Sequence, residues 1–214
     1  MSADAEATGS APLTVCIDFK NPHAWLAVPP TLALAQTLGI AVDWLPRIVA
    51  PIERPTPPGP DDDRGTLHRR YRAEYAVRDI GRYAAVHGLT LRGLHRRPDT
   101  RLASLGLLWV RRGGPEAAQR YMTALFTGHF EEALELEDPA ALRAVVEACG
   151  GDGAAFEAYT AGEGPTELDA LQATLAERGV FTVPTYLVGG ERFVGRAHLP
   201  LIREMLEQQA PGAH

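Results

Sequence analysis

The segment DFKNPHAWLA, residues 18–27, joins a predicted strand to a predicted helix and so sets the start of the fold. Before it, LTVCIDF (13–19) is apolar and rich in β-branched residues, which predicts a buried strand. Within it, Asn21 suits the N-cap of a helix and Pro22 suits its first turn. The pattern therefore predicts a strand that leads directly into a helix over 22–38.

A second strand is expected after this helix. Gly39 ends the helical pattern, and IAVDWLPRIVA (40–50) has the composition of a strand. Pro29 and Pro30 lie inside the helical pattern and are expected to kink the helix or split it in two. Strand, helix and strand in this order predict a βαβ unit with a parallel pair of strands. The following segment, 51–65, is rich in proline and acidic residues, and its length as a loop indicates a functional role.

The rest of the chain changes character twice. Residues 66–178 contain about five helical patterns separated by glycine and proline. FTVPTYLV and ERFVG then flank Gly189 and Gly190, which predicts a β-hairpin, and a last helix is expected over 198–209. Without the helical block, the element order is βαβ followed by ββα, which is the order of a thioredoxin fold.

The predicted fold class is therefore α/β, a thioredoxin fold with an all-helical insertion domain. The expected organisation is a disordered lead (1–12), a thioredoxin-like domain in two pieces (13–65 and 179–214) and a helical insertion (66–178).

Composition narrows the class of protein. The chain has 214 residues and a formal net charge of −6, which argues against nucleic acid as a partner because phosphate binding needs a basic surface. The first dozen residues lack the basic start and apolar run of a signal peptide, and no segment has the roughly 18 apolar residues of a membrane span. We therefore expect a cytoplasmic protein that does not enter a membrane.

The two cysteines, Cys16 and Cys149, are far apart in the sequence and neither belongs to a Cys-x-x-Cys pair. Redox cycling and metal binding therefore lack support. Cys16 lies in the apolar pattern of the first strand, and Cys149 lies at a predicted helix end. Both are expected to be structural thiols.

Four segments together resemble a known family. DFKNPHAWLA and GVFTVPTYLVGGERFVGRAHL resemble the two site-forming segments of the DsbA-like thioredoxin superfamily. YAVRDIGRYAAVHGL and ALFTGHFEEALELEDPAALRAVVEACGGD resemble its branch of 2-hydroxychromene-2-carboxylate isomerases and kappa-class glutathione transferases. The resemblance covers roughly residues 13–207.

The resemblance implies a site at the start of the first helix. In that branch a serine usually replaces the first redox cysteine and holds the sulfur of glutathione as a thiolate; Asn21 stands at this position. The segment TVPT matches the family's cis-proline turn, so Pro184 is the expected cis residue. The backbone of Val183 is then the expected partner for an extended peptide such as glutathione.

The γ-glutamyl end of glutathione would meet the segment Gly195-Arg196-Ala197-His198. The family commonly has an acidic residue here for the ammonium group, and Ala197 stands in its place. Arg196 remains available to a carboxylate. The resemblance therefore implies a glutathione site at Val183, Pro184, Arg196 and Ala197.

The residue types at the helix start allow two interpretations of Asn21. Its side-chain oxygen can cap the helix, or its NH₂ group can donate to a thiolate or enolate near the positive end of the helix. An amide cannot accept a proton, so general-base work by Asn21 is excluded. Thiol–disulfide exchange is also excluded, because neither motif position, Asn21 or Ala24, carries a thiol. His23 is either the acid or base of an altered mechanism or a polar residue of an exposed first turn.

Other candidate residues also have two interpretations. Trp25 and Trp44 are expected in core or dimer packing more than in substrate stacking, although Trp25 is kept as a substrate-binding candidate. Arg69 and Arg72, in the basic cluster LHRRYR, and Arg196 are candidates for binding a substrate carboxylate. The alternative for each is a solvated helix face.

Two functions are therefore expected. The first is an isomerase or glutathione-transferase-like enzyme that acts on a small conjugated or aromatic carboxylate, with glutathione as a co-substrate. The second is a binding protein for small molecules that has kept the fold and lost the thiol chemistry. The resemblance implies a homodimer.

Overall fold

The computed structural model describes residues 11–209 and contains a four-stranded mixed sheet in the order β2-β1-β3-β4. The strands are β1 (Leu13–Ile17), β2 (Val42–Pro46), β3 (Thr185–Val188) and β4 (Glu191–Val194). Strand β1 is parallel to β2 and antiparallel to β3, and β3 is antiparallel to β4. This arrangement confirms the predicted βαβ unit and the predicted hairpin. Most of the predicted lead, 1–12, lies outside the described residues.

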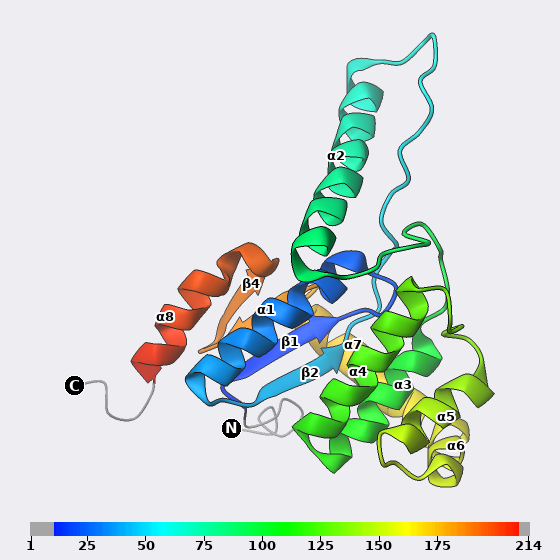
Figure 1. The fold of residues 1–214 in the computed structure, drawn as a ribbon, viewed down its shortest axis with the longest axis vertical. Coiled ribbons are helices and arrows are strands. Elements are labelled where there is room, and N and C mark those ends of the chain that lie inside the picture. The colour runs from blue at the N-terminus through cyan, green and yellow to red at the C-terminus, as the bar shows by residue number, and fades with distance from the viewer. Residues whose placement is uncertain (1–10, 210–214) are drawn as a thin grey trace.

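Most of the other described residues are helical (Figure 1). The helices are α1 (Pro22–Leu38), α2 (Arg64–His87), α3 (Arg101–Val110), α4 (Pro115–Phe130), α5 (Pro139–Ala148), α6 (Gly153–Ala161), α7 (Gly164–Glu177) and α8 (Leu199–Gln209), with short 3₁₀ turns at Arg111–Gly113 and Arg196–His198. Helices α2 to α7 lie between β2 and β3 in the sequence. The fold is therefore the predicted α/β class, a thioredoxin fold with an inserted helical block.

The first two strands are shorter than the sequence predicts. The backbone N–H of Asn21 donates to the carbonyl of Asp18 at 2.9 Å, and this turn ends β1 before the predicted end at 19. After β2, the N–H of Ile48 donates to the side chain of Gln172 in α7 at 3.0 Å instead of to another strand. Both strands thus end where the chain turns toward another element.

Helix α1 runs unbroken through Pro29 and Pro30, so of the two expected outcomes the split is wrong and a kink stays a prediction. Each proline lacks a backbone N–H, but the segments on both sides of the pair are buried. Directly after the prolines, the Thr31 hydroxyl lies 2.6 Å from the carbonyl oxygen of Ala27 and 2.9 Å from the Tyr186 hydroxyl. Packing and these hydrogen bonds hold the helix in one piece.

The hairpin between β3 and β4 turns at Gly189 and Gly190, whose φ angles are +57° and +84°. Two successive positive φ angles are typical of the two-residue turns that match the twist of a hairpin, and glycine adopts them without steric cost. The predicted turn is confirmed.

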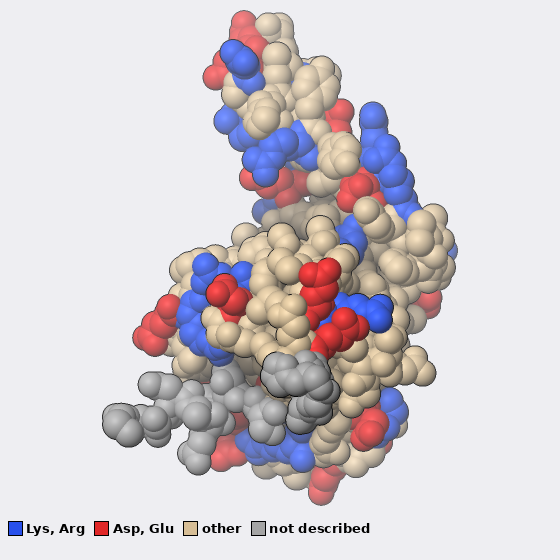
Figure 2. Space-filling model, turned by 90° about the vertical axis from the view of Figure 1, so that its left-hand side faces the viewer, with Lys and Arg blue, Asp and Glu red and all other residues tan. Residues whose placement is uncertain are grey.

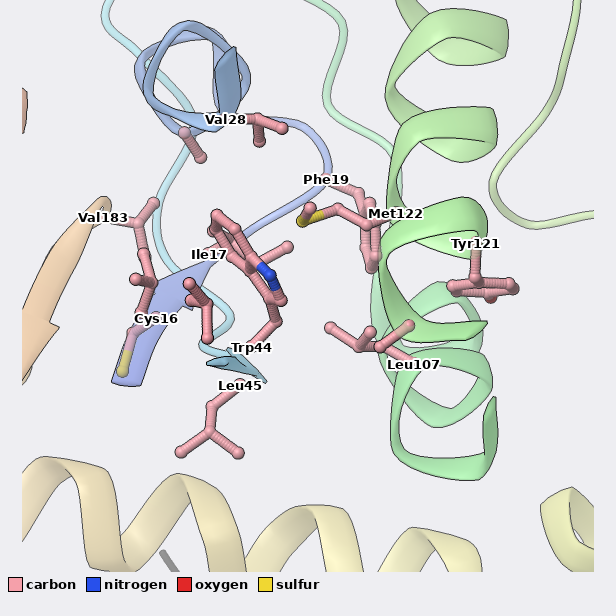
Figure 3. Close-up of a cluster of buried hydrophobic side chains, with 14 of the residues drawn as sticks. Cys16, Ile17, Phe19, Val28, Trp44, Leu45, Leu107, Tyr121, Met122 and Val183 are labelled. Carbon is pink, nitrogen blue, oxygen red and sulfur yellow. The ribbon is translucent and has the colours of Figure 1, made fainter. Parts of the chain in front are cut away.

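The core contains buried residues of the sheet, of the inserted helices, and of α1 and α8. Ile17 of β1 and Trp44 of β2 face Leu107 of α3 and Met122 of α4 (Figure 3). Helices α1 and α8 pack on each other, and α8 contacts β3. Because β1 is central in the sheet and fully buried, the turn that follows it is fixed at the edge of the core.

Helix α2 leaves the body of the molecule (Figure 1). Its C-terminal part is anchored to α1 through the buried side chains of Ile80 and Ala84, which pack with Leu26. Its N-terminal part projects outward beside the loop that precedes it (Figures 1 and 2). Arg70 of the helix pairs with Asp62 of that loop. We refer to residues 51–79, the loop and the projecting part of α2, as the arm.

None of the helices within residues 11–209 combines the length and the hydropathy needed to cross a lipid bilayer.

Candidate functional site

Asn21 is the N-cap of α1. Its Oδ1 accepts hydrogen bonds from the backbone N–H groups of His23 at 2.9 Å and Ala24 at 3.3 Å. A capping oxygen of this kind satisfies donors that the first helical turn leaves unpaired. The cap fixes the orientation of the Asn21 side chain relative to the helix axis.

The cap also determines where the Asn21 NH₂ group points. Oδ1 and Nδ2 lie on opposite sides of a planar amide, so an oxygen turned toward the helix turns Nδ2 away from it. Nδ2 makes no hydrogen bond to any residue in 11–209 that meets the usual geometric limits. The two interpretations of Asn21 are therefore compatible, since the oxygen caps while the NH₂ remains a free donor.

The cis-proline turn lies at the same end of the sheet as this cap. The Val183–Pro184 bond is cis, as the sequence predicted. Cys16 pairs with Thr185, the first residue of β3, across the antiparallel strands β1 and β3, so the turn before β3 and the turn after β1 lie next to each other at this end of the sheet. The N–H of Gly195 donates to the Pro184 carbonyl at 2.9 Å and ties the turn to the end of β4. The two segments predicted to form the site are thus adjacent.

Arg196 and Ala197 line a neighbouring pocket of about 490 Å³ between α2 and the start of α8. The Arg196 guanidinium lies 3.8 Å from the centre of the Tyr83 ring, a cation–π contact. It also lies 3.7 Å from the carboxylate of Asp79, which lines the same pocket. A cation and a carboxylate that share a pocket suit a ligand end carrying both a carboxylate and an ammonium group.

Asp79 was not found by sequence reasoning. The acidic group expected next to Arg196 is missing at position 197, and α2 supplies one from more than a hundred residues away. No sequence signal distinguishes Asp79 from other charged residues of a solvated helix.

His23 lies near the same charges. Burial lowers the pKa of His23 below its usual 6.5, and the positive charge of Arg196 lowers it further, while Asp79 acts in the opposite direction. The imidazole is therefore neutral at pH 7 and able to accept a proton. His23 is half-buried rather than on the exposed first turn of the alternative interpretation.

A buried ion pair lies directly before the cap. Lys20 Nζ is 2.8 Å from Asp18 Oδ2 and donates to Thr100 Oγ1 at 3.2 Å, and all three residues are buried. The same Asp18 oxygen accepts from the N–H of Val49 at 2.8 Å. This network holds the turn between β1 and α1 against α3. The two charges in DFKN were visible in the sequence, but their burial depends on Thr100, which is distant in the chain.

His129 lies on the α4 side of this network and is almost completely buried. Its Nδ1 has no hydrogen-bond partner within the described residues. Burial lowers the pKa of His129 to about 4, with the charge of Arg96 acting in the same direction and those of Glu135 and Asp18 opposing it. His129 is therefore neutral at pH 7.

Trp25 and Trp44, for which the sequence favoured packing over substrate stacking, are core residues. Trp25 is 5% exposed and stacks on Phe126 of α4, with ring centres 5.1 Å apart, and Trp44 is 2% exposed. Little of the Trp25 surface is left for a substrate to contact, so packing is the interpretation that the structure favours.

The structure does not bring Arg69 or Arg72 to the cap of α1. Both are exposed on the projecting part of α2. At 1.5 Å per residue, Arg72 lies about 16 Å along the helix axis from Tyr83, which contacts Arg196. Within one copy of the chain, only Arg196 of the three candidate arginines lies near the predicted site.

Neither cysteine takes part in the site. Both are buried, and burial raises the pKa of the Cys16 thiol to about 12 and also raises that of Cys149. They are protonated at neutral pH, as expected of structural thiols. Across residues 11–209, no group of histidine, cysteine and acidic side chains is arranged to hold a metal ion.

The fold and this corner define a thioredoxin-type protein with a capped helix start, a cis-proline turn and no thiol at the motif positions. The chain belongs to the family of the DSBA-like thioredoxin domain, whose model matches residues 13–207. The predicted superfamily is confirmed. Among curated proteins, the comparison finds no match.

Solved structures share the fold. A 2-hydroxychromene-2-carboxylate isomerase has a TM-score of 0.69 and 23% identity, over 92% of this chain and 94% of that one. A probable DsbA oxidoreductase from Streptomyces coelicolor has a TM-score of 0.67 and 18% identity, over 92% of this chain and 89% of that one. A third structure is that of the cytosolic disulfide reductase DsbM from Pseudomonas aeruginosa with GSH. It has a TM-score of 0.58 and 15% identity, over 92% of this chain and 98% of that one. At these identities the likeness is one of fold.

Proposed function

We propose that the protein is a glutathione-dependent enzyme of the isomerase or glutathione-transferase type that acts on a small conjugated or aromatic carboxylate. The observation that carries the proposal is the cap of α1, where the Asn21 oxygen is engaged and its NH₂ group is free. A free amide donor at the positive end of a helix stabilises an anion such as a thiolate or an enolate.

Glutathione would lie along the cis-proline turn. Its cysteine backbone would pair with Val183 as a short added strand, which places the sulfur toward Asn21. Its γ-glutamyl end would reach the neighbouring pocket, where Arg196 binds the carboxylate and Asp79 binds the ammonium group. Asp79 thereby replaces the acid that Ala197 lacks. The GSH named with DsbM, a relative in fold, is consistent with this placement.

The chemistry needs no protein thiol. The glutathione thiol loses its proton, which the neutral imidazole of His23 is able to accept. The thiolate adds to the conjugated carbon–carbon double bond, forming a C–S bond and moving an electron pair onto the carbonyl oxygen as an enolate. Rotation about the resulting single bond and elimination of the thiolate return the double bond in the other configuration. Asn21 stabilises both anions without accepting a proton.

One observation favours the alternative, a glutathione-independent binding protein for small molecules. The Asn21 oxygen occupies two backbone N–H groups that an anion would otherwise use. Such a protein would bind the carboxylate of its ligand at Arg196. The N–H groups at the start of α1 would then bind only the Asn21 oxygen and no ligand.

Thermal unfolding with millimolar glutathione separates the two functions, because a ligand that binds only the native state raises the melting temperature. We expect a rise in the wild type, and a smaller one with S-methylglutathione, which cannot form a thiolate. No rise with either compound would contradict glutathione binding.

Two substitutions of Asn21 provide matched variants. Asp and Ser are both good N-caps, so N21D and N21S should fold like the wild type. N21D replaces the NH₂ donor with a carboxylate oxygen and should lose the preference for glutathione over S-methylglutathione. N21S keeps a donor and should retain it. D79N should weaken both ligands equally, since it affects only the γ-glutamyl end.

A further inference from the structure

Two connections of the inserted block meet beside the first turns of α1. Ile52, at the start of the arm, and Leu94, in the connection between α2 and α3, both pack against the cluster that contains Leu26 of α1. Figure 1 shows both connections near the start of α1. Two segments that are distant in the chain thus come together at this place.

The connection between α2 and α3 is fixed here by a tight turn. The N–H of Arg96 donates to the carbonyl of Gly93 at 2.8 Å, and Gly93 has a φ of +59°. A side chain at position 93 would be strained, and its Cβ would lie 2.6 Å from the Arg96 side chain. The N–H of Arg92 also donates to the carbonyl of Phe130 at 2.9 Å. His95, within this turn, is therefore held in a defined position.

His95 has two cationic neighbours. Its Nδ1 is buried and has no hydrogen-bond partner within residues 11–209. Burial lowers the pKa of His95 below its usual 6.5, and the charges of Arg54 and Arg97 lower it further, with no described acidic residue acting in the opposite direction. Both arginines are exposed, and neither forms an ion pair with another described residue. We refer to Arg54, His95 and Arg97 as the basic cluster.

The basic cluster lacks the negative charge that would balance it. The formal net charge of the chain is −6, so composition alone does not explain a group of unpaired cations. An acid partner does occur in the same turn, since Arg96 pairs with Glu135. A bound anion would offset the repulsion between like charges, because guanidinium groups bind a carboxylate through parallel hydrogen bonds. It would also give the buried imidazole nitrogen a partner.

The surface next to the basic cluster is apolar. Leu94 directly precedes His95, and Ile52 lies two residues before Arg54. Both apolar side chains are partly buried, so part of each remains accessible. Pro55, which follows Arg54, is half-buried as well. Sites for small molecules combine apolar walls with a few polar groups that fix the orientation of the ligand. This place therefore suits a ligand with a carboxylate and a flat apolar body.

We propose that the basic cluster binds the carboxylate of a conjugated or aromatic acid whose apolar body lies against Ile52 and Leu94. The assignment of this acid as the substrate rests on the proposed function, whereas its binding does not.

The position of the basic cluster fits a substrate site. The turn before Asn21 is tied to this connection, because Lys20 donates to Thr100 at 3.2 Å. Arg97 lies three residues before Thr100, a backbone span of at most about 11 Å. None of the residues that line the pocket of Arg196 belongs to the basic cluster. The acid and glutathione can therefore bind at the same time, which an addition reaction between them requires.

Calorimetric titration with cinnamate tests the site in the absence of glutathione. Cinnamate carries a carboxylate on a conjugated aromatic body, cinnamamide has the same body without the charge, and acetate has the charge without the body. The wild type should bind cinnamate at least about tenfold more tightly than either of the others. No binding of cinnamate, or equal affinity for cinnamamide, would overturn the proposal. Equal affinity for acetate would overturn the apolar contact.

Three glutamine variants locate the carboxylate. R54Q and R97Q should each raise the Kd of cinnamate at least about tenfold and leave that of cinnamamide unchanged. R92Q removes an exposed arginine of the same connection, outside the basic cluster, and should change neither. An unchanged Kd in R54Q or R97Q, or an equal rise in R92Q, would overturn the proposal. So would a rise confined to R196Q, which would place the carboxylate in the neighbouring pocket. Circular dichroism establishes that the variants fold.

Thermal unfolding separates this inference from the proposed function. In the wild type, the rises in melting temperature with cinnamate and with glutathione should add, and R97Q should retain the rise with glutathione. A rise with glutathione and no dependence of cinnamate binding on the basic cluster would overturn the inference alone. Cinnamate binding that depends on the basic cluster, without any rise with glutathione, would support the inference and contradict the proposed enzyme.

Discussion

Helices α1 and α2 show how differently two helices of one molecule are supported. Helix α1 has 17 residues and contains two adjacent prolines, yet nine of its residues are buried and it runs without a break. Helix α2 has 24 residues and no proline, yet four are buried and much of it projects outward. Burial therefore outweighs intrinsic helix propensity in α1. Helix α2 has the more favourable sequence and the weaker support.

The largest expected effect comes from removing core packing under α1. Leu26 is fully buried and packs against Ile80 and Ala84, where the two helices meet. L26A should lower the free energy of unfolding by about 2 to 5 kcal/mol through lost burial and a cavity. Urea denaturation of the wild type and L26A measures this difference in the free energy of unfolding. A loss below about 1 kcal/mol would mean that this contact does not anchor α2.

Acidification tests the burial of His129 in α4, next to the turn that precedes α1. The pKa of His129 falls from its usual 6.5 to about 4 in the folded state, so folding favours the neutral imidazole. Its contribution to the free energy of unfolding is complete above pH 6.5 and is lost as the pH falls toward 4. The loss is up to about 3 kcal/mol.

Urea denaturation across this pH range measures the effect, and H129Q provides the control because glutamine does not titrate. The variant should show a shallower dependence on pH than the wild type. Equal slopes would contradict the lowered pKa of His129.

A smaller effect is expected where α1 continues past its prolines. T31V removes the hydroxyl that contacts the carbonyl of Ala27 and the hydroxyl of Tyr186, and leaves the buried Tyr186 group without that partner. The free energy of unfolding should fall by about 1 to 3 kcal/mol. T37V removes a similar bond to a backbone carbonyl at an exposed position of the same helix and should cost less. Equal losses in the two variants would show that burial of the Thr31 bond is unimportant.

The smallest effect is expected on the projecting part of α2. Arg69 is exposed and its side chain contacts the hydroxyl of Thr66 one turn away. R69A should change the free energy of unfolding by no more than about 0.5 kcal/mol, as is usual for exposed positions. Urea denaturation in parallel with L26A compares the two helices directly. A loss above about 1 kcal/mol would show that the projecting part is coupled to the core.

Much of the site could be predicted from the sequence, because its parts are recognised from residue types at a few neighbouring positions. Asn21 and Pro22 mark a helix start, and the segment around Pro184 resembles a cis-proline turn; the structure contains both. Asp79 could not be predicted, because its position beside Arg196 depends on how α2 packs. The burial of Lys20 depends in the same way on Thr100, the residue that precedes α3.

The sequence by itself determined the order of strands and helices, the hairpin turn, the helix cap and the family, because each depends on residue types over a few neighbouring positions. Only the tertiary structure decided that α1 continues through its prolines, that Asp79 lies beside Arg196, and that the N-terminal part of α2 projects from the body. These features depend on contacts between residues far apart in the chain. The free energy of such contacts, about 1 to 5 kcal/mol each in a core, exceeds the local preferences that a sequence pattern records.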